Sequence, residues 1–264
     1  MTKKTNIYDQ IIEKIFFSHF KTGSSSFEFD REEITSTANA LDLPIPKNLG
    51  DLIYSFRYRE PLPERILATQ EPQLEWIIEG VAKGRYKFQL VKPFDATPNE
   101  QLTKTKILEA TPGIIVKYAS SDEQALLAKI RYNRLIDIFT GLTCYSLQNH
   151  WRTTREGVQA EIDEVYIGLD KRGVHFVLPV EAKGESEKIG GVQIRQDIAL
   201  CKENFPDAIC KAVGAQFLSD NLIVLFEFEL IDEEIRIVTE RHYRLVNPTE
   251  LSAEELKKYR QRTE

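Results

Sequence analysis

With 264 residues, the chain is long enough for one large domain or two smaller ones. Hydrophobic residues make up 42% and charged residues 29%, which is the balance of an ordinary globular protein. The net charge of −6 argues against an indiscriminate, histone-like DNA binder. It does not exclude a site-specific binder, because acidic outer faces can coexist with a basic cleft.

The first part of the chain predicts a small DNA-binding domain in residues 1–95. Apolar residues at helical spacing predict a helix over residues 7–21, and Asp30 with Glu33 predicts an N-cap and capping box for a second helix. The remaining expected elements are an extended piece at 27–29, helices over 31–41 and 47–58, and strands at 76–80 and 86–90. Helix, helix-turn-helix and hairpin in that order are typical of a winged helix-turn-helix.

Residues 96–120 contain prolines and no long periodic segment, which predicts a linker. A second domain is then expected over residues 121–264, beginning with a helix over 122–139. Its other expected elements are a short helix at 144–150, a helix at 191–203, a terminal helix within 248–264, and strands at 159–169, 175–182, 212–217, 222–230 and 235–244. This order predicts an α/β or α+β class.

Two of these strands carry a group of charged residues. Gly173 predicts a tight hairpin between the strands at 159–169 and 175–182. Glu181 and Lys183 are two residues apart and therefore share one face of their strand. Asp163, on the neighbouring strand, lies beside Glu181 if the hairpin register allows. We expect two carboxylates and an ammonium group on a surface whose underside is apolar.

This set suits metal-assisted hydrolysis of a phosphodiester. Two carboxylates provide the oxygen ligands that Mg²⁺ prefers, and the metal polarises the phosphoryl oxygen and activates bound water. The lysine orients or deprotonates the attacking water and neutralises charge in the transition state. The alternative is a solvated sheet face, because alternating charges are common there and an E-x-K triplet alone is a weak signal.

Two further residues are candidates for the same site. Glu123 falls on the apolar side of its predicted helix, where a carboxylate needs a partner such as a metal ion. Its alternative role is to favour the helix dipole from the first turn. Gln193 shares a helix face with Gln196 and Asp197; it could support the lysine or touch a phosphate, or be a solvated amide.

Other kinds of site have little support in the sequence. The three cysteines form no CxxC pair, which argues against structural zinc and a disulfide framework. The four histidines show no HxH or HxxxH spacing. P-loop and GxGxxG motifs are absent, so no nucleotide cofactor is expected. With no run of about 18 apolar residues and no signal-peptide pattern, we expect a cytoplasmic protein without a membrane partner.

The expected helix at 47–58 and the hairpin after it carry candidate DNA contacts. The second helix of a helix-turn-helix enters the major groove, and arginine and asparagine suit the edges of guanine and adenine. The candidates are Lys47, Asn48, Arg57, Tyr58 and Arg59 on the helix, with Lys83, Arg85 and Lys87 on the hairpin as phosphate contacts. The alternative is that these are ordinary surface charges.

The motifs together resemble the PD-(D/E)xK nuclease superfamily. Segments 157–166 (GVQAEIDEVY) and 176–184 (FVLPVEAKG) look like a group of predicted type II restriction endonucleases, as do 152–154, 192–197, 214–217 and 46–59. The resemblance implies a restriction-endonuclease-like core with a central mixed β-sheet flanked by helices, and double-stranded DNA as substrate. It also implies Mg²⁺ held by Asp163, Glu181, the Ala182 backbone carbonyl and Glu123. The superfamily's proline is replaced by Ile162.

The leading hypothesis is therefore a type II restriction endonuclease of a restriction-modification system, with a recognition domain before its nuclease core. Palindromic targets favour a homodimer as a further hypothesis. Two alternatives remain open: a structure-selective repair or recombination nuclease with the same core, and a non-catalytic winged-helix DNA-binding regulator.

Overall fold

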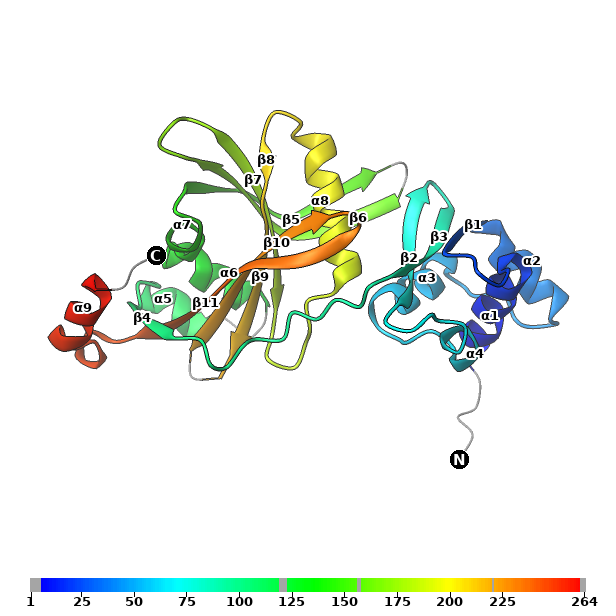
Figure 1. Cartoon of the computed structure of the whole chain (residues 1–264), viewed down its shortest axis with the longest axis horizontal. Coiled ribbons are helices and arrows are strands. Elements are labelled where there is room, and N and C mark those ends of the chain that lie inside the picture. The colour runs from blue at the N-terminus through cyan, green and yellow to red at the C-terminus, as the bar shows by residue number, and fades with distance from the viewer. Residues whose placement is uncertain (1–5, 119–122, 156–157, 220, 262–264) are drawn as a thin grey trace.

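The computed structural model describes residues 6–118, 123–155, 158–219 and 221–261. Figure 1 shows two groups of elements along the longest axis of the molecule. We call residues 6–91 the N-terminal lobe and residues 104–260 the core lobe. The final helix, α9 (Ala253–Arg260), lies at the end of the molecule farthest from the N-terminal lobe. In the described ranges, no helix combines the length and the apolar character that a bilayer span requires.

The N-terminal lobe combines helices with a three-stranded antiparallel sheet in the order β1-β3-β2. Its elements are α1 (Ile7–His19), β1 (Ser26–Asp30), α2 (Glu32–Ala40), α3 (Leu49–Tyr58), α4 (Glu64–Leu67), β2 (Glu75–Ala82) and β3 (Arg85–Val91). Arg31, not Asp30, holds the N-cap position of α2, although Glu33 Oε1 accepts the Asp30 N–H as the predicted capping box requires.

An aromatic cluster forms the centre of this lobe. Apolar residues recur at helical spacing along α1, so one stripe of the helix is buried. Phe16 is fully buried in that stripe and makes edge contacts with Trp76 of β2 and Phe88 of β3. The burial of these large rings accounts for the packing of α1 on the sheet.

The core lobe is built on one mixed sheet with the strand order β4-β11-β10-β9-β7-β6-β5. Its strands are β4 (Lys104–Leu108), β5 (Thr143–Arg155), β6 (Val158–Leu169), β7 (His175–Lys183), β9 (Ala212–Leu218), β10 (Leu222–Ile231) and β11 (Glu234–Val246), with β8 (Ile209–Cys210) beside β7. β7 is antiparallel to β6 and parallel to β9. The predicted mixed α/β class is confirmed.

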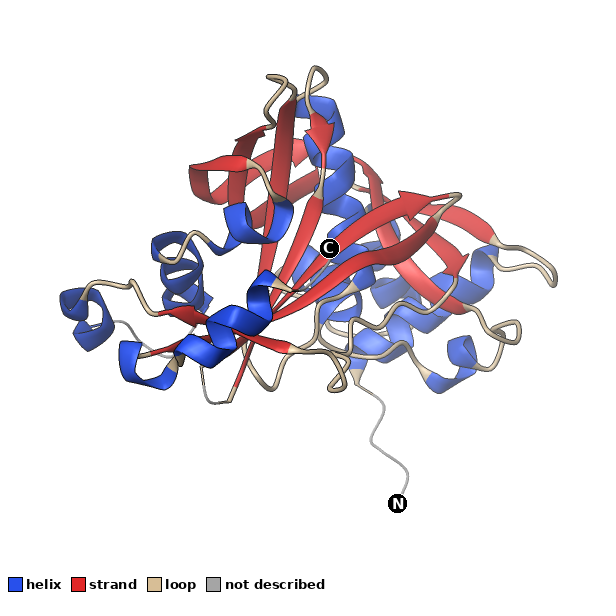
Figure 2. Ribbon diagram, turned by 60° about the vertical axis from the view of Figure 1, so that its left-hand side comes forward, coloured by secondary structure: helices blue, strands red, loops and turns tan. Residues whose placement is uncertain are grey.

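Helices cover both faces of this sheet (Figure 2). On one face, α6 (Glu123–Tyr132) and α7 (Leu135–Thr140) pack on a cluster that includes Val180 and Ala182 of β7. On the other face, α8 (Gly191–Asn204) packs on apolar residues that include Val177. Alternation along β7 therefore sends neighbouring residues to opposite helical layers. The peripheral helices are α5 (Gly113–Tyr118), a 3₁₀ turn at Pro248–Glu250, and α9.

Three further sequence-based expectations differ from the structure. The short helix predicted at residues 144–150 is wrong, because these residues belong to β5, which pairs antiparallel with β6 and carries a β-bulge between Ser146 and Gln148. The helix predicted over 122–139 is two helices, broken at Arg134, whose φ of +53° is left-handed. The expected linker at 96–120 contains β4 and α5, and β4 pairs in parallel with β11. In each case tertiary pairing or a local turn overrides the pattern.

We expect Phe16→Ala to lower the free energy of unfolding of the N-terminal lobe by about 3–5 kcal/mol, because it leaves a large cavity. The matched control is Phe17→Ala, since Phe17 is only partly buried. Urea unfolding followed by tryptophan fluorescence measures both losses, because Trp76 lies beside Phe16. Equal losses for the two variants would contradict the central place of Phe16.

Candidate active site

The site forms where β6 and β7 stop pairing. The two strands pair in register from Leu169↔His175 to Glu164↔Val180. The next pair in sequence, Asp163 with Glu181, is not part of this ladder, while β7 continues alongside β9 through Lys183↔Gln216. The strands therefore separate at the carboxyl end of β7, which frees polar backbone groups on that edge.

The side chain of Asp163 bridges the gap between the separating strands. Its Oδ2 accepts a hydrogen bond from the backbone N–H of Ala182 at 2.8 Å. Ala182 lies between Glu181 and Lys183, so this bond holds the Asp163 carboxylate beside both. In an extended strand the N–H and carbonyl of one residue point to the same side, so the Ala182 carbonyl faces the same edge.

Glu181 and Lys183 share a face of β7, as predicted. Val180 and Ala182 pack in the α6–α7 layer, so the residues that alternate with them face α8. The Glu181 side chain is fully buried, and that of Lys183 is 14% exposed. The Lys183 ammonium lies 2.6 Å from Glu181 Oε1, which balances one of the buried charges.

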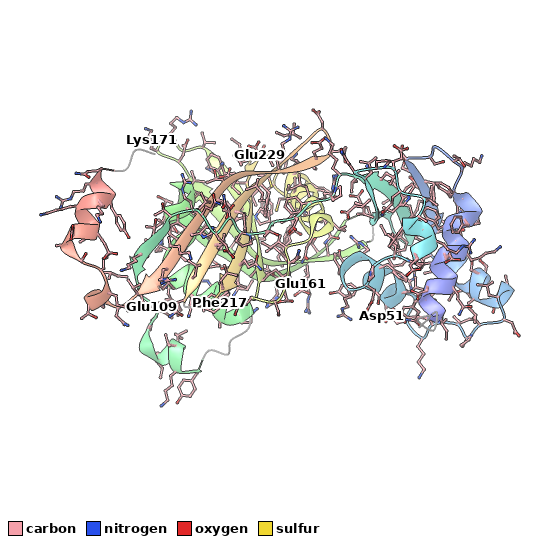
Figure 3. All side chains as sticks on the ribbon, turned by 60° about the horizontal axis from the view of Figure 1, so that its bottom comes forward. Asp51, Glu109, Glu161, Lys171, Phe217 and Glu229 are labelled. Atoms are coloured by element: carbon pink, nitrogen blue, oxygen red, sulfur yellow. The ribbon has the colours of Figure 1, made fainter. Side chains whose placement is uncertain are left out.

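Asp163 is held in a desolvated position. Burial raises the pKa of its carboxyl, while the Ala182 N–H and the Lys183 ammonium act in the opposite direction. His150, on β5, also lowers the Asp163 pKa. His150 belongs to a polar group on the rim of the site, where its Nδ1 lies 2.9 Å from Glu161 Oε1. Figure 3 shows Glu161 on the part of the core lobe nearest to the N-terminal lobe.

The neighbouring acid, Glu164, belongs to the other face of the sheet. It is fully buried, and its Oε1 accepts hydrogen bonds from the guanidinium of Arg131 and the hydroxyl of Ser146. Arg131 lies on α6, in the layer opposite α8. Two consecutive acids on β6 thus have different surroundings: a structural ion pair for Glu164, and the open end of the strand ladder for Asp163.

α8 contributes an acid that the sequence interpretation did not assign to the site. Asp197 is 1% exposed, and burial together with Glu181 and Asp163 raises its carboxyl pKa well above the ordinary range. The helical spacing of Gln193, Gln196 and Asp197 was the available signal. Periodicity places the three on one face, but it does not tell that Asp197 is the member turned toward the sheet.

Gln193 and Glu123, the other predicted site residues, lie on α8 and α6, and Gln216 is a further polar residue near Lys183. Gln193 is half-buried in the first turn of α8. Glu123 begins α6, but its side chain lies outside the described residues. Gln216, next to Lys183 on β9, is 6% exposed and donates a hydrogen bond from Nε2 to the Glu187 carbonyl at 2.8 Å. This bond anchors the loop that leads from β7 to α8.

Two of the candidate DNA contacts face the core lobe. Arg57 Nη2 donates to Gln196 Oε1 at 2.8 Å, and Arg57 Nε donates to the Ile78 carbonyl at 3.2 Å. The hydroxyl of Tyr58 donates to the same Gln196 oxygen at 3.2 Å. Burial, with the charges of Asp197 and Glu181, raises the Tyr58 pKa to about 12, while Arg57 lowers it. The end of α3 therefore lies close to the acids of the core.

A cavity of about 290 Å³ lies at this boundary between the lobes. Its walls include residues of α3, β2, β3 and α8, so both lobes contribute to it. Its lining includes Arg57, Lys87, Arg195 and Gln196. The Asp163, Glu181 and Lys183 side chains are not among the residues that line it.

The remaining candidates on α3 lie near its two ends. Lys47 is exposed, and Asn48 is the N-cap residue, with Oδ1 accepting the Gly50 N–H at 3.0 Å. The helix therefore begins one residue after Asn48, not at Lys47. Arg59 is exposed, and its guanidinium lies over the Tyr54 ring at 4.7 Å.

The β2–β3 hairpin carries three candidates with different partners. Lys83 is exposed at the tip. Arg85 is also exposed and pairs with Asp30 at 3.3 Å, and Lys87 pairs with Glu79 at 3.3 Å. Surface pairs of this kind are weak, so phosphate groups can compete for these cations.

The acidic side chains of the site lie near one another but do not surround a common point. Within the described ranges, no three side chains of histidine, cysteine, aspartate or glutamate are placed as a ready-made metal cluster. Both carboxylate oxygens of Asp197 are buried without a hydrogen-bond partner in the same ranges. Buried oxygens without donors fit a cation, because a hard divalent ion takes carboxylate oxygens as ligands.

No protein-family model, curated protein or solved structure matches the chain.

We expect Gln196→Ala to lower the free energy of unfolding by about 1–3 kcal/mol, because it removes the acceptor shared by Arg57 and Tyr58 across the two lobes. Gln193→Ala, one turn earlier on the same helix, is the matched control and should cost less. Denaturant unfolding of both variants makes the comparison. Equal losses of unfolding free energy in the two variants would show that the Gln196 hydrogen bonds do not stabilise the interface between the lobes.

Proposed function

We propose that this chain is a Mg²⁺-dependent DNA endonuclease that hydrolyses phosphodiester bonds at a site built from Asp163, Glu181 and Lys183. One observation carries the proposal. Where β6 and β7 separate, the Asp163 carboxylate is bonded to the amide between Glu181 and Lys183. Two acids and an ammonium group are thus held together at the open end of a strand ladder.

The chain's own residues suit a divalent cation. Asp163, Glu181 and the Ala182 carbonyl offer oxygen atoms near the carboxyl end of β7, and the donor set matches the hard-ligand preference of Mg²⁺. When bound, Mg²⁺ supplies Lewis-acid polarisation of the phosphate and a more acidic water. Glu181 and Asp197 are buried carboxyl groups whose ionised forms such an ion would stabilise.

Lys183 has two tasks in this proposal. Its ammonium lies 2.6 Å from Glu181 Oε1 and balances that carboxylate. When Asp163 and Glu181 bind a cation, the Lys183 ammonium can orient the attacking water and stabilise the negative charge that grows on the phosphate. The low solvent exposure of the side chain strengthens both interactions.

We assign target recognition to the N-terminal lobe as a winged helix-turn-helix. The order α1, β1, α2, α3, α4, β2, β3, with the short helix α4 between α3 and the hairpin and a sheet ordered β1-β3-β2, supports this assignment. Lys47 and Arg59, which flank α3, and Lys83 at the hairpin tip are exposed, where DNA can reach them. Arg57 and Tyr58 bond to Gln196, so they would join the lobes unless DNA binding moves α3.

A recognition lobe attached to a nuclease core favours a type II restriction endonuclease acting on double-stranded DNA. A symmetric target suits a two-fold dimer, in which each copy cuts one strand. Size-exclusion mass, measured with and without DNA, tests the dimer: a doubled mass with DNA supports it, and a monomer in both conditions contradicts it.

Plasmid digestion in Mg²⁺ tests the proposed activity and separates its rivals. Discrete fragments support a site-specific endonuclease. Cutting restricted to junctions or flaps indicates a structure-selective nuclease, and binding without any cutting indicates a non-catalytic regulator. Sequencing the fragment ends then gives the target.

We expect Lys183→Ala and Asp163→Asn each to lower the cleavage rate by about 100-fold or more, because each removes a group that stabilises the transition state. Lys188→Ala is the control, since Lys188 lies five residues farther along and is 78% exposed. Lys183→Ala should still bind DNA. Intact cleavage by the Lys183 and Asp163 variants would overturn the site.

We expect Lys83→Ala to weaken DNA binding and to reduce the slope of log affinity against log salt by about one, as the loss of one phosphate contact requires. Lys171→Ala provides the control, because Lys171 is exposed at a hairpin of the core lobe, away from the N-terminal lobe (Figure 3). Fluorescence anisotropy across a salt series measures both. The same slope change for Lys171→Ala would argue against a wing at Lys83.

A further inference from the structure

The middle of α8 turns an acid toward the sheet. Ile194, Ile198 and Cys201 are buried and pack in the apolar clusters on this face of the sheet. Asp197 belongs to the same stripe by helical spacing and is 1% exposed. A position of this kind normally holds an apolar residue.

The Asp197 carboxylate lacks the usual compensation for burial. Neither of its oxygens has a hydrogen-bond partner among the residues that the structure describes. A buried polar group without a partner opposes folding. A purely structural aspartate is expected to hold a backbone amide, a hydroxyl or a cation, as Glu164 does with Arg131 on the other face.

The charged groups around Asp197 make its ionised form still less favourable. Glu181 and Asp163 act on it as like charges, and Lys183 opposes them. Lys183 lies 2.6 Å from Glu181 Oε1, so its charge is shared. If all three acids were ionised, one ammonium group would not balance their charge at this nearly dry position, whereas a divalent cation would.

We propose that Asp197 is a third carboxylate of a divalent-cation site that it shares with Asp163 and Glu181. The inference rests on the proposed function and adds α8 as the source of a ligand. The residue before it, Gln196, accepts hydrogen bonds from Arg57 and Tyr58. The helix that carries this acid is therefore held by the sheet on one side and by the N-terminal lobe on the other.

Titration of Mn²⁺ into the whole chain, with free Mn²⁺ followed by electron paramagnetic resonance, tests the inference. Asp197→Asn should weaken Mn²⁺ binding by at least about tenfold, because even the loss of a group that only supports a metal ligand typically costs about 10–100-fold in affinity. Without cation, the same variant should unfold at the same or a higher urea concentration than the parent, because it removes a buried carboxyl group without a partner. A structural role predicts the reverse: lower stability and unchanged Mn²⁺ affinity.

Two controls separate this inference from the proposed function. Asp207→Asn changes an exposed acid just after α8 and should leave Mn²⁺ binding unchanged. Asp163→Asn should weaken it. If Asp163→Asn weakens binding and Asp197→Asn does not, or if Asp197→Asn unfolds the chain, Asp197 is structural and the inference fails alone. If neither variant changes Mn²⁺ affinity, the cation site and the proposed nuclease both fail.

Discussion

The bond between the Asp163 carboxylate and the Ala182 amide is the contact on which the site depends. Along most of the hairpin, the backbones of β6 and β7 are hydrogen-bonded to each other. At the end of the hairpin, the Ala182 N–H donates instead to the Asp163 side chain. An acid is thereby tied to the backbone between Glu181 and Lys183. The tie is direct and short, so it places the three groups together without a long or flexible connection.

Burying these acidic side chains opposes folding at the site, and the apolar core around the site offsets this unfavourable free energy. Glu181 and Asp197 are buried between β7 and α8, although charges are normally kept in water. Large apolar clusters lie on both faces of the same sheet. Their burial supplies the favourable free energy that allows a few strained electrostatic positions. Functional sites are where such departures from ordinary stability rules are expected.

The site strands were predictable from the sequence because their signals are local. The apolar run at residues 176–180 and the turn at Gly173 define the β6–β7 hairpin, and the two-residue period puts Glu181 and Lys183 on one face. The α8 pattern was equally clear. β5 was missed because its pairing with β6 is a tertiary contact, and residues 144–150 carry no decisive strand pattern of their own.

The orientation of surface residues was harder to predict than the elements that carry them. The spacing of Gln193, Gln196 and Asp197 indicates a shared helix face, but only the packing of α8 tells which member is buried. Arg57 and Tyr58 follow the pattern of DNA-contacting residues, yet their partner is Gln196, 139 and 138 positions away in sequence. Contacts of this range depend on how the two lobes meet.

Anomalous diffraction from crystals soaked in Mn²⁺ tests the central claim most directly. The account predicts one strong peak at about 2 Å from carboxylate oxygens of Asp163 and Glu181, with the Lys183 ammonium displaced from Glu181. Mn²⁺ bound only elsewhere on the surface, with the Glu181–Lys183 ion pair intact, would contradict it.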